Sequence, residues 1–233
     1  MENLKKYAKM IDHSLLHPTL TDQELKEGCE LAKKYNVASV CIKPYAVKNA
    51  VEWLTGSDVL VGCVIGFPHG NSSIDVKCYE TEQAILDGAV EIDMVVNIGK
   101  VLSNDWEYVE EEIKQIVGIT KKYKAVLKVI FENDYLPEDK YKIRLCEICT
   151  KYNVEYVKTS SGYGFKKDKD GHYYYDGATD EDLILMRKYS GCQVKVKAAG
   201  GVRTLEDLKR VRDLGVSRIG ASATEKILTN RTD

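Results

Sequence analysis

The chain has 233 residues, 44% hydrophobic and 30% charged, so it can bury one substantial core but is short for two enzyme-sized domains. Its formal net charge is -2 and its lysines are dispersed along the sequence, so it lacks the concentrated basic surface of a nucleic-acid-binding protein. We therefore expect no nucleic-acid partner. The longest apolar run, Val59 to Phe67, is far shorter than a membrane span of about 20 residues, so we expect a soluble, cytoplasmic protein with no membrane partner.

Short runs rich in valine and isoleucine alternate with longer segments whose apolar residues recur every three or four positions, which predicts alternating strands and helices. Most of the cysteines lie inside apolar runs, as reduced core thiols do, so we expect no disulfides. The predicted strands are, in chain order, Ile11–Leu15, Val37–Ile42, Val59–Ile65, Val90–Val96, Ala125–Phe131, Tyr156–Thr159, Gln193–Ala198 and Val216–Ile219.

Residues that commonly cap helices mark the segments between these strands. Thr21 and Glu24 have the spacing of a capping box, in which each side chain accepts a hydrogen bond from the other residue's backbone N–H. Further signals are Thr179 and Thr204 before acidic first turns, Pro137 in a first turn, and Gly88 and Gly215 after helix ends. A helix is therefore expected after each strand.

This repeated order of strand and helix predicts an α/β fold, a closed (β/α)8 TIM barrel in which residues 1–233 form a single domain. The alternative is an open, doubly wound parallel sheet. Against it, no G-x-G-x-x-G follows the first strand, and glycines follow the late strands, where the phosphate site of a barrel usually lies. In a barrel we expect the chemistry at the C-terminal ends of the strands.

Charged residues lie inside the predicted strands, where an unpaired charge is costly to bury. Any one of them alone could form a structural ion pair. Together they predict strongly coupled pKa values, and a lysine beside another cation loses its proton readily and becomes a nucleophile near neutral pH. The residues concerned are Asp12, Asp93, Lys128, Lys158, Lys195 and Lys197.

A neutral lysine without a metal-binding pattern indicates Schiff-base chemistry on a carbonyl compound. The histidines show no HxH or HExxH spacing and are more simply capping or surface residues, so we expect no metal site. Gly200-Gly201, and Gly220 with Ser222, each precede a predicted helix and suit phosphate binding by backbone N–H groups. The same glycines could merely permit tight turns.

Eight motifs resemble, in order, those of the deoxyribose-phosphate aldolases, class I aldolases of (β/α)8 fold. They extend along nearly the whole chain: IDHSLL, VCIKPY, VIGFPHG, EIDMVVNIG, LKVI, VKTSSG, VKAAGGVR and IGAS. The resemblance implies reversible cleavage of 2-deoxy-D-ribose 5-phosphate to acetaldehyde and D-glyceraldehyde 3-phosphate. It also implies that the enzyme needs no cofactor, and we expect it to form a homodimer.

Carried over residue by residue, the resemblance implies that Lys158 forms the Schiff base and that Lys197 lowers the pKa of Lys158. Asp93 then transfers protons together with a water molecule. The expected substrate-binding positions are Asp12 and Ser14 near the hydroxyls, Cys41 in the acceptor region, Lys128, and a phosphate cradle of Gly162, Gly200, Gly201, Gly220 and Ser222.

Four single positions depart from the pattern of the family. Ser14 stands where threonine is usual, which keeps the hydroxyl, and Ala223 stands where many members carry a second serine on the phosphate side. Lys195 and Lys43 replace a small and a polar residue respectively. We expect these two lysines either to compensate for the missing serine or to indicate another anionic substrate.

Residues 166–176 (KKDKDGHYYYD) form an apparent insertion at the active face. Asp170-Gly171 suits a hairpin turn, and residues 173–175 could cover the site as a lid. The alternative is a solvated or disordered loop. The segment does not fit a calcium loop, because Gly171 comes too early and the closing glutamate is missing.

Three functional hypotheses stay open from the sequence. The first is the aldolase, and the second is a related Schiff-base barrel acting on a different aldehyde or sugar phosphate. The third is a non-catalytic barrel that binds sugar phosphates. The third conflicts with the presence of Lys158, Lys197 and Asp93 together, because ligand binding alone has no need of a neutral lysine.

Overall fold

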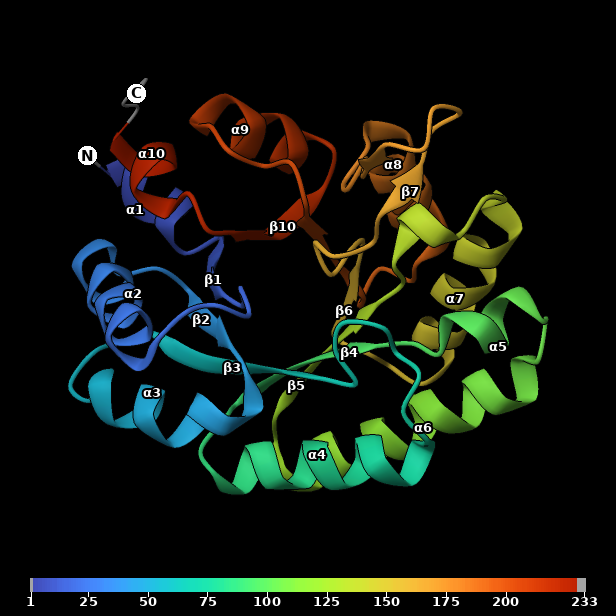
Figure 1. The fold of residues 1–233 in the computed structure, drawn as a ribbon, viewed down its shortest axis with the longest axis horizontal. Helices are drawn as coiled ribbons and strands as arrows, with labels where there is room; N and C mark the ends of the chain where they lie inside the picture. Colours follow the sequence, from blue (N-terminus) through green and yellow to red (C-terminus); the bar gives the residue numbers. More distant parts are fainter. Residues whose placement is uncertain (1, 230–233) are drawn as a thin grey trace.

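The structure, a computed structural model, describes residues 2–229, and within them eight parallel strands close into a barrel (Figure 1). In pairing order they are β1 (Ile11–Leu15), β10 (Val216–Ala221), β9 (Lys195–Ala199), β6 (Tyr156–Lys158), β5 (Val126–Ile130), β4 (Glu91–Val95), β3 (Leu60–Ile65) and β2 (Ser39–Ile42). Strand β1 pairs with both β2 and β10, so this sheet has no edge. The predicted barrel is confirmed, and the open doubly wound alternative is wrong.

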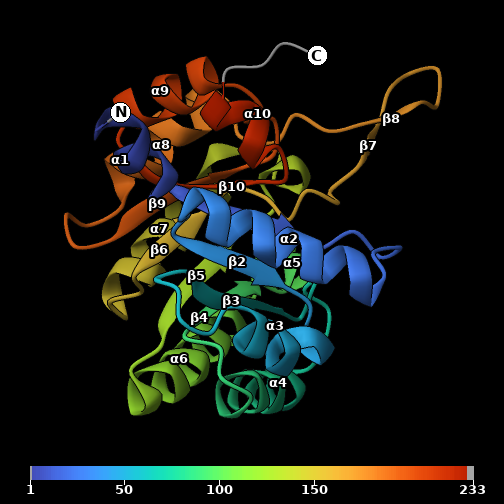
Figure 2. The same ribbon diagram turned by 90° about the vertical axis from the view of Figure 1, so that its left-hand side faces the viewer.

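Helices surround the barrel and connect its strands (Figures 1 and 2). They are α1 (Glu2–Ala8), α2 (Asp22–Tyr35), α3 (Val47–Trp53), α4 (Ile74–Leu86), α5 (Ile98–Leu102), α6 (Trp106–Tyr123), α7 (Asp139–Lys151), α8 (Asp180–Tyr189), α9 (Leu205–Asp213) and α10 (Thr224–Thr229). Short 3-10 helices follow two strands, η1 (Pro44–Ala46) and η2 (Asn133–Tyr135). A separate antiparallel pair, β7 (Lys166–Lys167) and β8 (Tyr173–Tyr174), lies within the insertion.

Most of the predicted helix caps are confirmed. Thr21 and Thr204 both form complete capping boxes, and the Thr179 side chain accepts a hydrogen bond from the backbone N–H of Asp182. Gly88 and Gly215 follow helix ends with positive φ angles of 111° and 92°, which favour glycine.

The prediction for Pro137 is wrong by two positions. The N-cap of α7 is Glu138, whose extended φ of -118° and ψ of 139° place the first helical residue at Asp139. Strand β2 also starts later than predicted. The N–H of Val37 instead donates to the carbonyl of Ala32, which completes the C-terminal end of α2.

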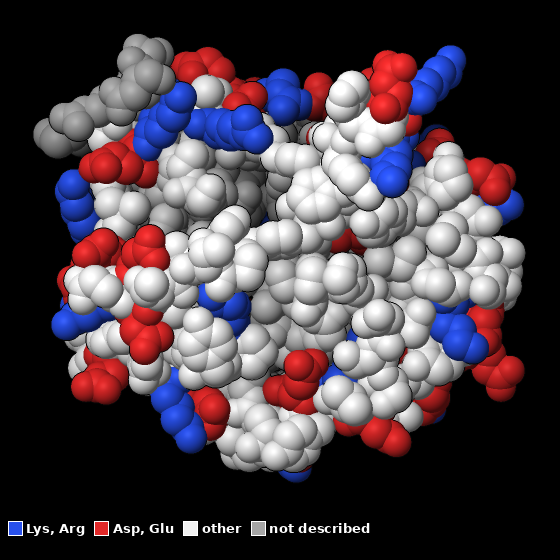
Figure 3. Space-filling view, viewed as in Figure 1, with Lys and Arg blue, Asp and Glu red and all other residues white. Residues whose placement is uncertain are grey.

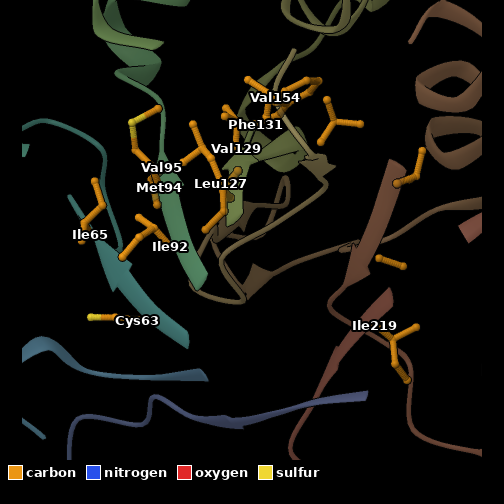
Figure 4. Close-up of a cluster of buried hydrophobic side chains, with 14 of the residues drawn as sticks. Cys63, Ile65, Ile92, Met94, Val95, Leu127, Val129, Phe131, Val154 and Ile219 are labelled. Carbon is orange, nitrogen blue, oxygen red and sulfur yellow. The ribbon is translucent and has the colours of Figure 1, made fainter. Parts of the chain in front are cut away.

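Side chains alternate between the two faces of each strand, and this separates an apolar layer from a charged interior. Figure 4 shows the apolar layer on three adjacent strands, with labelled members Cys63, Ile65, Ile92, Met94, Leu127 and Val129. Each such side chain contributes about 1.5–3 kcal/mol when fully buried against the helices. Glu91, Asp93 and Lys128 occupy the alternate positions and therefore point into the barrel.

A buried ion pair outside the barrel joins two helices to strand β4. The Lys77 Nζ of α4 donates to Glu112 Oε1 of α6 at 2.6 Å and to the Val95 carbonyl at 2.7 Å. Glu112 Oε2 accepts from the backbone N–H of Asn97 at 3.0 Å. Burial lowers the pKa of Lys77 and raises the pKa of Glu112, although each partner opposes the shift in the other. Removing either partner would therefore leave an unpaired buried charge and lower the free energy of unfolding.

Replacing Lys77 by Met should lower the free energy of unfolding by about 3–5 kcal/mol, because it leaves the Glu112 carboxylate buried without its cation. The double variant Lys77→Met with Glu112→Gln should be more stable than Lys77→Met alone. The amide oxygen of Gln can still accept from Asn97 and carries no charge. Urea unfolding followed by circular dichroism measures both changes.

The matched control is Lys122→Met, which removes a solvent-exposed pair between Lys122 and Glu82 on the same two helices. This variant should leave the urea midpoint almost unchanged. Equal losses in Lys77→Met and Lys122→Met would show that burial does not govern the strength of these pairs.

Candidate active site

Charged side chains from six strands meet inside the barrel and form what we call the interior charge cluster. Contacts join strands that are not neighbours in the sheet. Lys128 Nζ of β5 lies 2.9 Å from Asp12 Oδ2 of β1. Because these strands are not neighbours, the two side chains can meet only in the interior of the barrel. The members are Asp12 (β1), Glu91 and Asp93 (β4), Lys128 (β5), Lys158 (β6), Lys197 (β9) and Arg218 (β10).

Strand register places Lys158 directly beside Lys197, because these two residues are paired between β6 and β9. One oxygen of Asp93, Oδ2, accepts a hydrogen bond from the Nζ of each lysine at 2.7 Å. Lys197 also lies 2.5 Å from Asp12, whereas Lys158 contacts no second carboxylate among the described residues. The positive charge of Lys197 is therefore paired with two carboxylates, whereas that of Lys158 is paired with one.

This inequality shifts the pKa values of the two lysines in opposite directions. Burial lowers the pKa of Lys158, and the charge of Lys197 adds to the effect, although Asp93 opposes it. Burial also acts to lower the pKa of Lys197, but Asp12 and Asp93 outweigh it and raise that pKa above its ordinary value. Lys158 is therefore the better nucleophile, and Lys197 stays protonated beside it.

Asp93 and Lys128 remain charged for related reasons. Burial acts to raise the pKa of Asp93, but Lys128, Lys158 and Lys197 hold it well below its usual range. Burial acts to lower the pKa of Lys128, but Asp12, Asp93 and Glu91 hold it well above its usual range. The cluster thus keeps an ionised carboxylate within hydrogen-bond distance of the reactive amine.

Above the cluster lies a cavity of about 580 Å³, bounded by the segments that follow β1, β6, β9 and β10. Its lining includes Lys158 at the bottom and a glycine-rich rim. Gly162, Gly200 and Gly201 have φ angles near 90°, which other residues rarely adopt. Figure 3 shows one hollowed face, with uncharged side chains around its middle and charged ones toward its edges. At these three glycines the rim of the cavity presents backbone groups, rather than large side chains, to a ligand.

The predicted site residues fall into two groups by position. The first lines the cavity and comprises Lys158, Ser14, Gly162, Gly200, Gly201, Gly220 and Ser222. The second is buried and comprises Asp12, Asp93, Lys128, Lys197 and Cys41. Lys128 is fully buried, and its Nζ is engaged by Asp12, Glu91 and Asp93. The residues of this second set do not line the cavity, so they can act on a ligand mainly by positioning the side chains that touch it.

Cys41 packs with Leu16 and Val64 in a small apolar cluster against which Phe67 and Tyr163 lie. Burial raises the pKa of the Cys41 thiol to about 11, and nearby Asp93 adds to this. The thiol is therefore uncharged at neutral pH, and the cluster forms an apolar wall beside the bottom of the cavity.

Of the two additional lysines, one is at the active face and one is not. Lys43 follows β2, and its Nζ donates to the carbonyl of His17 at 3.0 Å. Lys195 is the first residue of β9, at the opposite end of the barrel, where it is exposed and lies over the Tyr156 ring. The expectation that Lys195 adds charge to the phosphate cradle is therefore wrong, because Lys195 stands at the N-terminal end of β9 and Lys197 lies two residues further along the strand, nearer the active face.

Sequence reasoning missed Glu91 and Arg218, the remaining members of the cluster. Arg218 donates to Asp12 and, at 3.0 Å, to Glu91, while Lys128 lies 2.5 Å from Glu91. Glu91 stands two residues before Asp93, so the alternation of strand β4 could have revealed it. Arg218 lies beyond a shift in pairing register between Val216 and Arg218, which obscures its direction in the sequence.

Glu132 was also missed. Its carboxylate accepts hydrogen bonds from the backbone N–H and the hydroxyl of Ser161, and so fixes the loop that follows Lys158. Burial raises the pKa of Glu132, although the Ser161 hydrogen bonds oppose the shift. A glutamate just after a strand looks like an ordinary surface residue, and no sequence signal distinguished it.

Two further observations concern the described residues as a whole. None of the helices within residues 2–229 has the length and apolar character needed to cross a membrane. Within the same range, the side chains grouped closely enough to hold a metal ion are Asp168, Asp170 and His172, all exposed on the hairpin. This group does not line the cavity.

Comparison with known proteins agrees with this geometry. The sequence profile described as DeoC/LacD family aldolase matches residues 6–224. A deoxyribose-phosphate aldolase of Rhodopirellula baltica is 52% identical over 221 residues, covering 95% of this chain and 87% of that protein. One of Bacillus cytotoxicus is 45% identical over 223 residues, covering 96% of this chain and 95% of that protein.

A solved structure extends the comparison to the fold. The tetrameric deoxyribose phosphate aldolase of Aeropyrum pernix superposes with a TM-score of 0.86 at 28% identity, covering 99% of this chain and 92% of that one. The fold is thus that of a (β/α)8-barrel aldolase, a lyase that cleaves carbon–carbon bonds. The chain belongs to the DeoC/LacD family of aldolases. The family resemblance of its motifs is confirmed.

Replacing Lys197 by Met should raise the pKa of Lys158, since it removes a neighbouring positive charge and leaves Asp93 Oδ2 to Lys158. A higher pKa means less neutral amine, so reductive alkylation of Lys158 by acetaldehyde and cyanoborohydride at pH 7 should slow about tenfold. Its midpoint should move to higher pH. Mass spectrometry of the Lys158 peptide across a pH series gives the midpoint.

Lys43→Met serves as the control, because Lys43 lies at the same face outside the cluster. It should leave the midpoint where it is. An unchanged midpoint in Lys197→Met would contradict the role assigned to Lys197.

Proposed function

We propose that the chain is a deoxyribose-phosphate aldolase that reversibly cleaves 2-deoxy-D-ribose 5-phosphate to acetaldehyde and D-glyceraldehyde 3-phosphate. The observation that carries the proposal is the position of Lys158. Its amine is buried, has a lowered pKa and donates a hydrogen bond to Asp93. It lies at the bottom of a cavity with a glycine-rich rim. The names of the close relatives support the same substrate.

The chemistry follows from the neutral amine. Lys158 Nζ adds to the C1 aldehyde of the open-chain sugar, and loss of water gives a protonated imine. The imine accepts the electron pair of the C2–C3 bond when the proton of the C3 hydroxyl is removed. D-Glyceraldehyde 3-phosphate leaves, and an enamine of two carbons remains. Protonation at C2 and addition of water then release acetaldehyde and restore the amine.

The residues around Lys158 suit the proton transfers. In our proposal Asp93, kept ionised by three lysines, accepts and returns protons together with a water molecule. Burial of Lys158, together with the cationic Lys197 beside it, favours the neutral form of the Lys158 amine in the free enzyme. Asp12 holds Lys197 and Lys128 from the opposite side of the barrel, and Ser14 presents its hydroxyl to the cavity.

The other end of the cavity suits the phosphate. Gly200 and Gly201 stand just before Thr204, the N-cap of α9, so backbone N–H groups at a helix start lie close to the rim. Any side chain at Gly220 would lie 3.3 Å from Ala199 Cβ and 3.6 Å from Lys197 Cε, so glycine keeps the cavity open above the cluster. A sugar phosphate could then place C1 at Lys158 and its phosphate at the rim.

Treating the full chain with acetaldehyde and borohydride should leave an ethyl group on Lys158, because the reduced imine is stable to hydrolysis. Peptide mass spectrometry locates the group, and Lys158→Met should abolish both the label and the cleavage activity. A label on Lys197 or Lys195 in place of Lys158 would refute the assignment.

The substrate itself is tested by comparing 2-deoxyribose 5-phosphate with 2-deoxyribose, with acetaldehyde release as the readout. We expect kcat/KM to favour the phosphorylated sugar by about a hundredfold or more, since charge-assisted hydrogen bonds to the phosphate contribute a few kcal/mol together. Comparable activity on both sugars would leave a Schiff-base aldolase of another substrate as the better hypothesis. No cleavage, with Lys158 unlabelled, would leave a non-catalytic sugar-phosphate-binding barrel.

We also propose that the enzyme acts in the cytoplasm, in the catabolism of deoxyribonucleotides, as a homodimer. Buried thiols such as Cys29 and Cys146, whose pKa values burial raises to about 12, suit a reducing compartment. The tetrameric relative supports self-association within the family. Light scattering coupled to gel filtration measures the assembly directly.

A further inference from the structure

The inserted segment forms an ordered hairpin rather than a structureless loop. Strands β7 and β8 pair antiparallel, with Lys166 opposite Tyr174 and Lys167 opposite Tyr173. At the turn, the Asp168 carboxylate accepts from the backbone N–H groups of Asp170 and His172. The hairpin predicted around Asp170-Gly171 is confirmed, and Figure 2 shows it standing out beside the barrel.

Both ends of the hairpin are held by η2, the short helix after β5. The Asp134 carboxylate accepts from the backbone N–H groups of Asp176 and Gly177, at 2.6 and 3.1 Å. The Tyr135 hydroxyl accepts from the N–H of Phe165 at 3.1 Å. The residues at the base of the hairpin therefore have a fixed position relative to the rim of the cavity.

Tyr175 projects from this base into the cavity, which it lines together with Phe165 and Arg203. The Phe165 and Tyr175 rings meet edge to face, with centroids 6.3 Å apart. Any Cβ at Gly200 would lie 3.6 Å from the Tyr175 ring, which places the ring beside the predicted phosphate cradle. The Tyr175 hydroxyl accepts a hydrogen bond from Arg203 Nη2 at 2.9 Å.

Arg203 is exposed, and its charge has no carboxylate partner among the residues that the structure describes. Within residues 2–229 its guanidinium forms no ion pair, in contrast to the lysines below, which meet Asp93. The Tyr175 hydroxyl accepts from Arg203, so its own proton remains available to donate. The pair therefore presents a cation and a neutral donor to the end of the cavity that holds Gly200 and Gly201. An anion with several acceptor oxygens fits this arrangement.

We propose that Tyr175, contributed by the inserted hairpin, is a specificity-determining residue that donates a hydrogen bond to the phosphate of the substrate and orients Arg203 toward the same group. The inference rests on the proposed function and deepens it. Ala223 lines the same cavity and offers no hydroxyl, so Tyr175 supplies a hydrogen bond that this side chain cannot give. The insertion thus completes the site from outside the barrel.

Tyr175→Phe tests the proposal in the full chain, because it removes the hydroxyl and keeps the ring that packs on Phe165. We expect kcat/KM for 2-deoxyribose 5-phosphate to fall about ten- to a hundredfold through KM, the effect of one hydrogen bond to a charged group. The value for 2-deoxyribose should stay within about twofold of the native enzyme. Competitive inhibition by inorganic phosphate should weaken in parallel.

Tyr174→Phe is the matched control, since Tyr174 lies in the same hairpin, is exposed, and stacks its ring on Lys166 without lining the cavity. It should behave as the native enzyme with both sugars. Identical kinetics in the two variants, or an equal fall with both sugars in Tyr175→Phe, would overturn the role of Tyr175. Failure of the native chain to prefer the phosphorylated sugar would instead overturn the proposed function.

Discussion

The balance of charge inside the barrel governs the rest of the active site. Four basic groups (Lys128, Lys158, Lys197 and Arg218) share the interior with three carboxylates (Asp12, Glu91 and Asp93). An uncompensated buried charge costs several kcal/mol, so the network is least costly when one basic group is neutral. Lys158 has the fewest carboxylate contacts among the lysines and carries the lowered pKa. The lowered pKa of Lys158 is therefore a consequence of its burial within the network rather than a property of one residue.

Strand register makes this balance possible. The period of two along a strand puts Lys158 and Lys197 inside together with Asp93, and leaves Val157 and Val196 outside against the helices. A slip of one residue in a single strand would exchange a charge for a valine on both faces. Closure of the sheet prevents such a slip, because every strand is paired on both sides. The fold thereby holds Lys158 and its charged neighbours on the strands of the barrel.

Most of the strands and the family could be predicted from the sequence, whereas several of the buried ion pairs and hydrogen bonds could not. Period and capping signals predicted the strands, because they depend on local chemistry, and the motifs gave the family. Arg218, Glu132 and the pair of Lys77 and Glu112 were missed because their partners lie 29 to 206 positions away along the chain. Lys195 was misplaced because the sequence predicted the strand over Gln193–Ala198, whereas β9 starts at Lys195, which puts this residue at the end of the strand remote from the cavity.

In our proposal the insertion acts on substrate choice from the rim of the cavity, apart from the buried interior charge cluster. Burial lowers the pKa of Lys158, and the charged side chains that act on it, Asp93 and Lys197, lie below the cavity and do not belong to the hairpin. The hairpin is anchored to η2 and reaches the rim through Tyr175, whose hydroxyl accepts from Arg203 in the segment after β9. A change there acts on the remote part of the substrate, whose binding energy positions the reacting carbon. Loops on a rigid barrel can therefore vary specificity while the nucleophile stays constant.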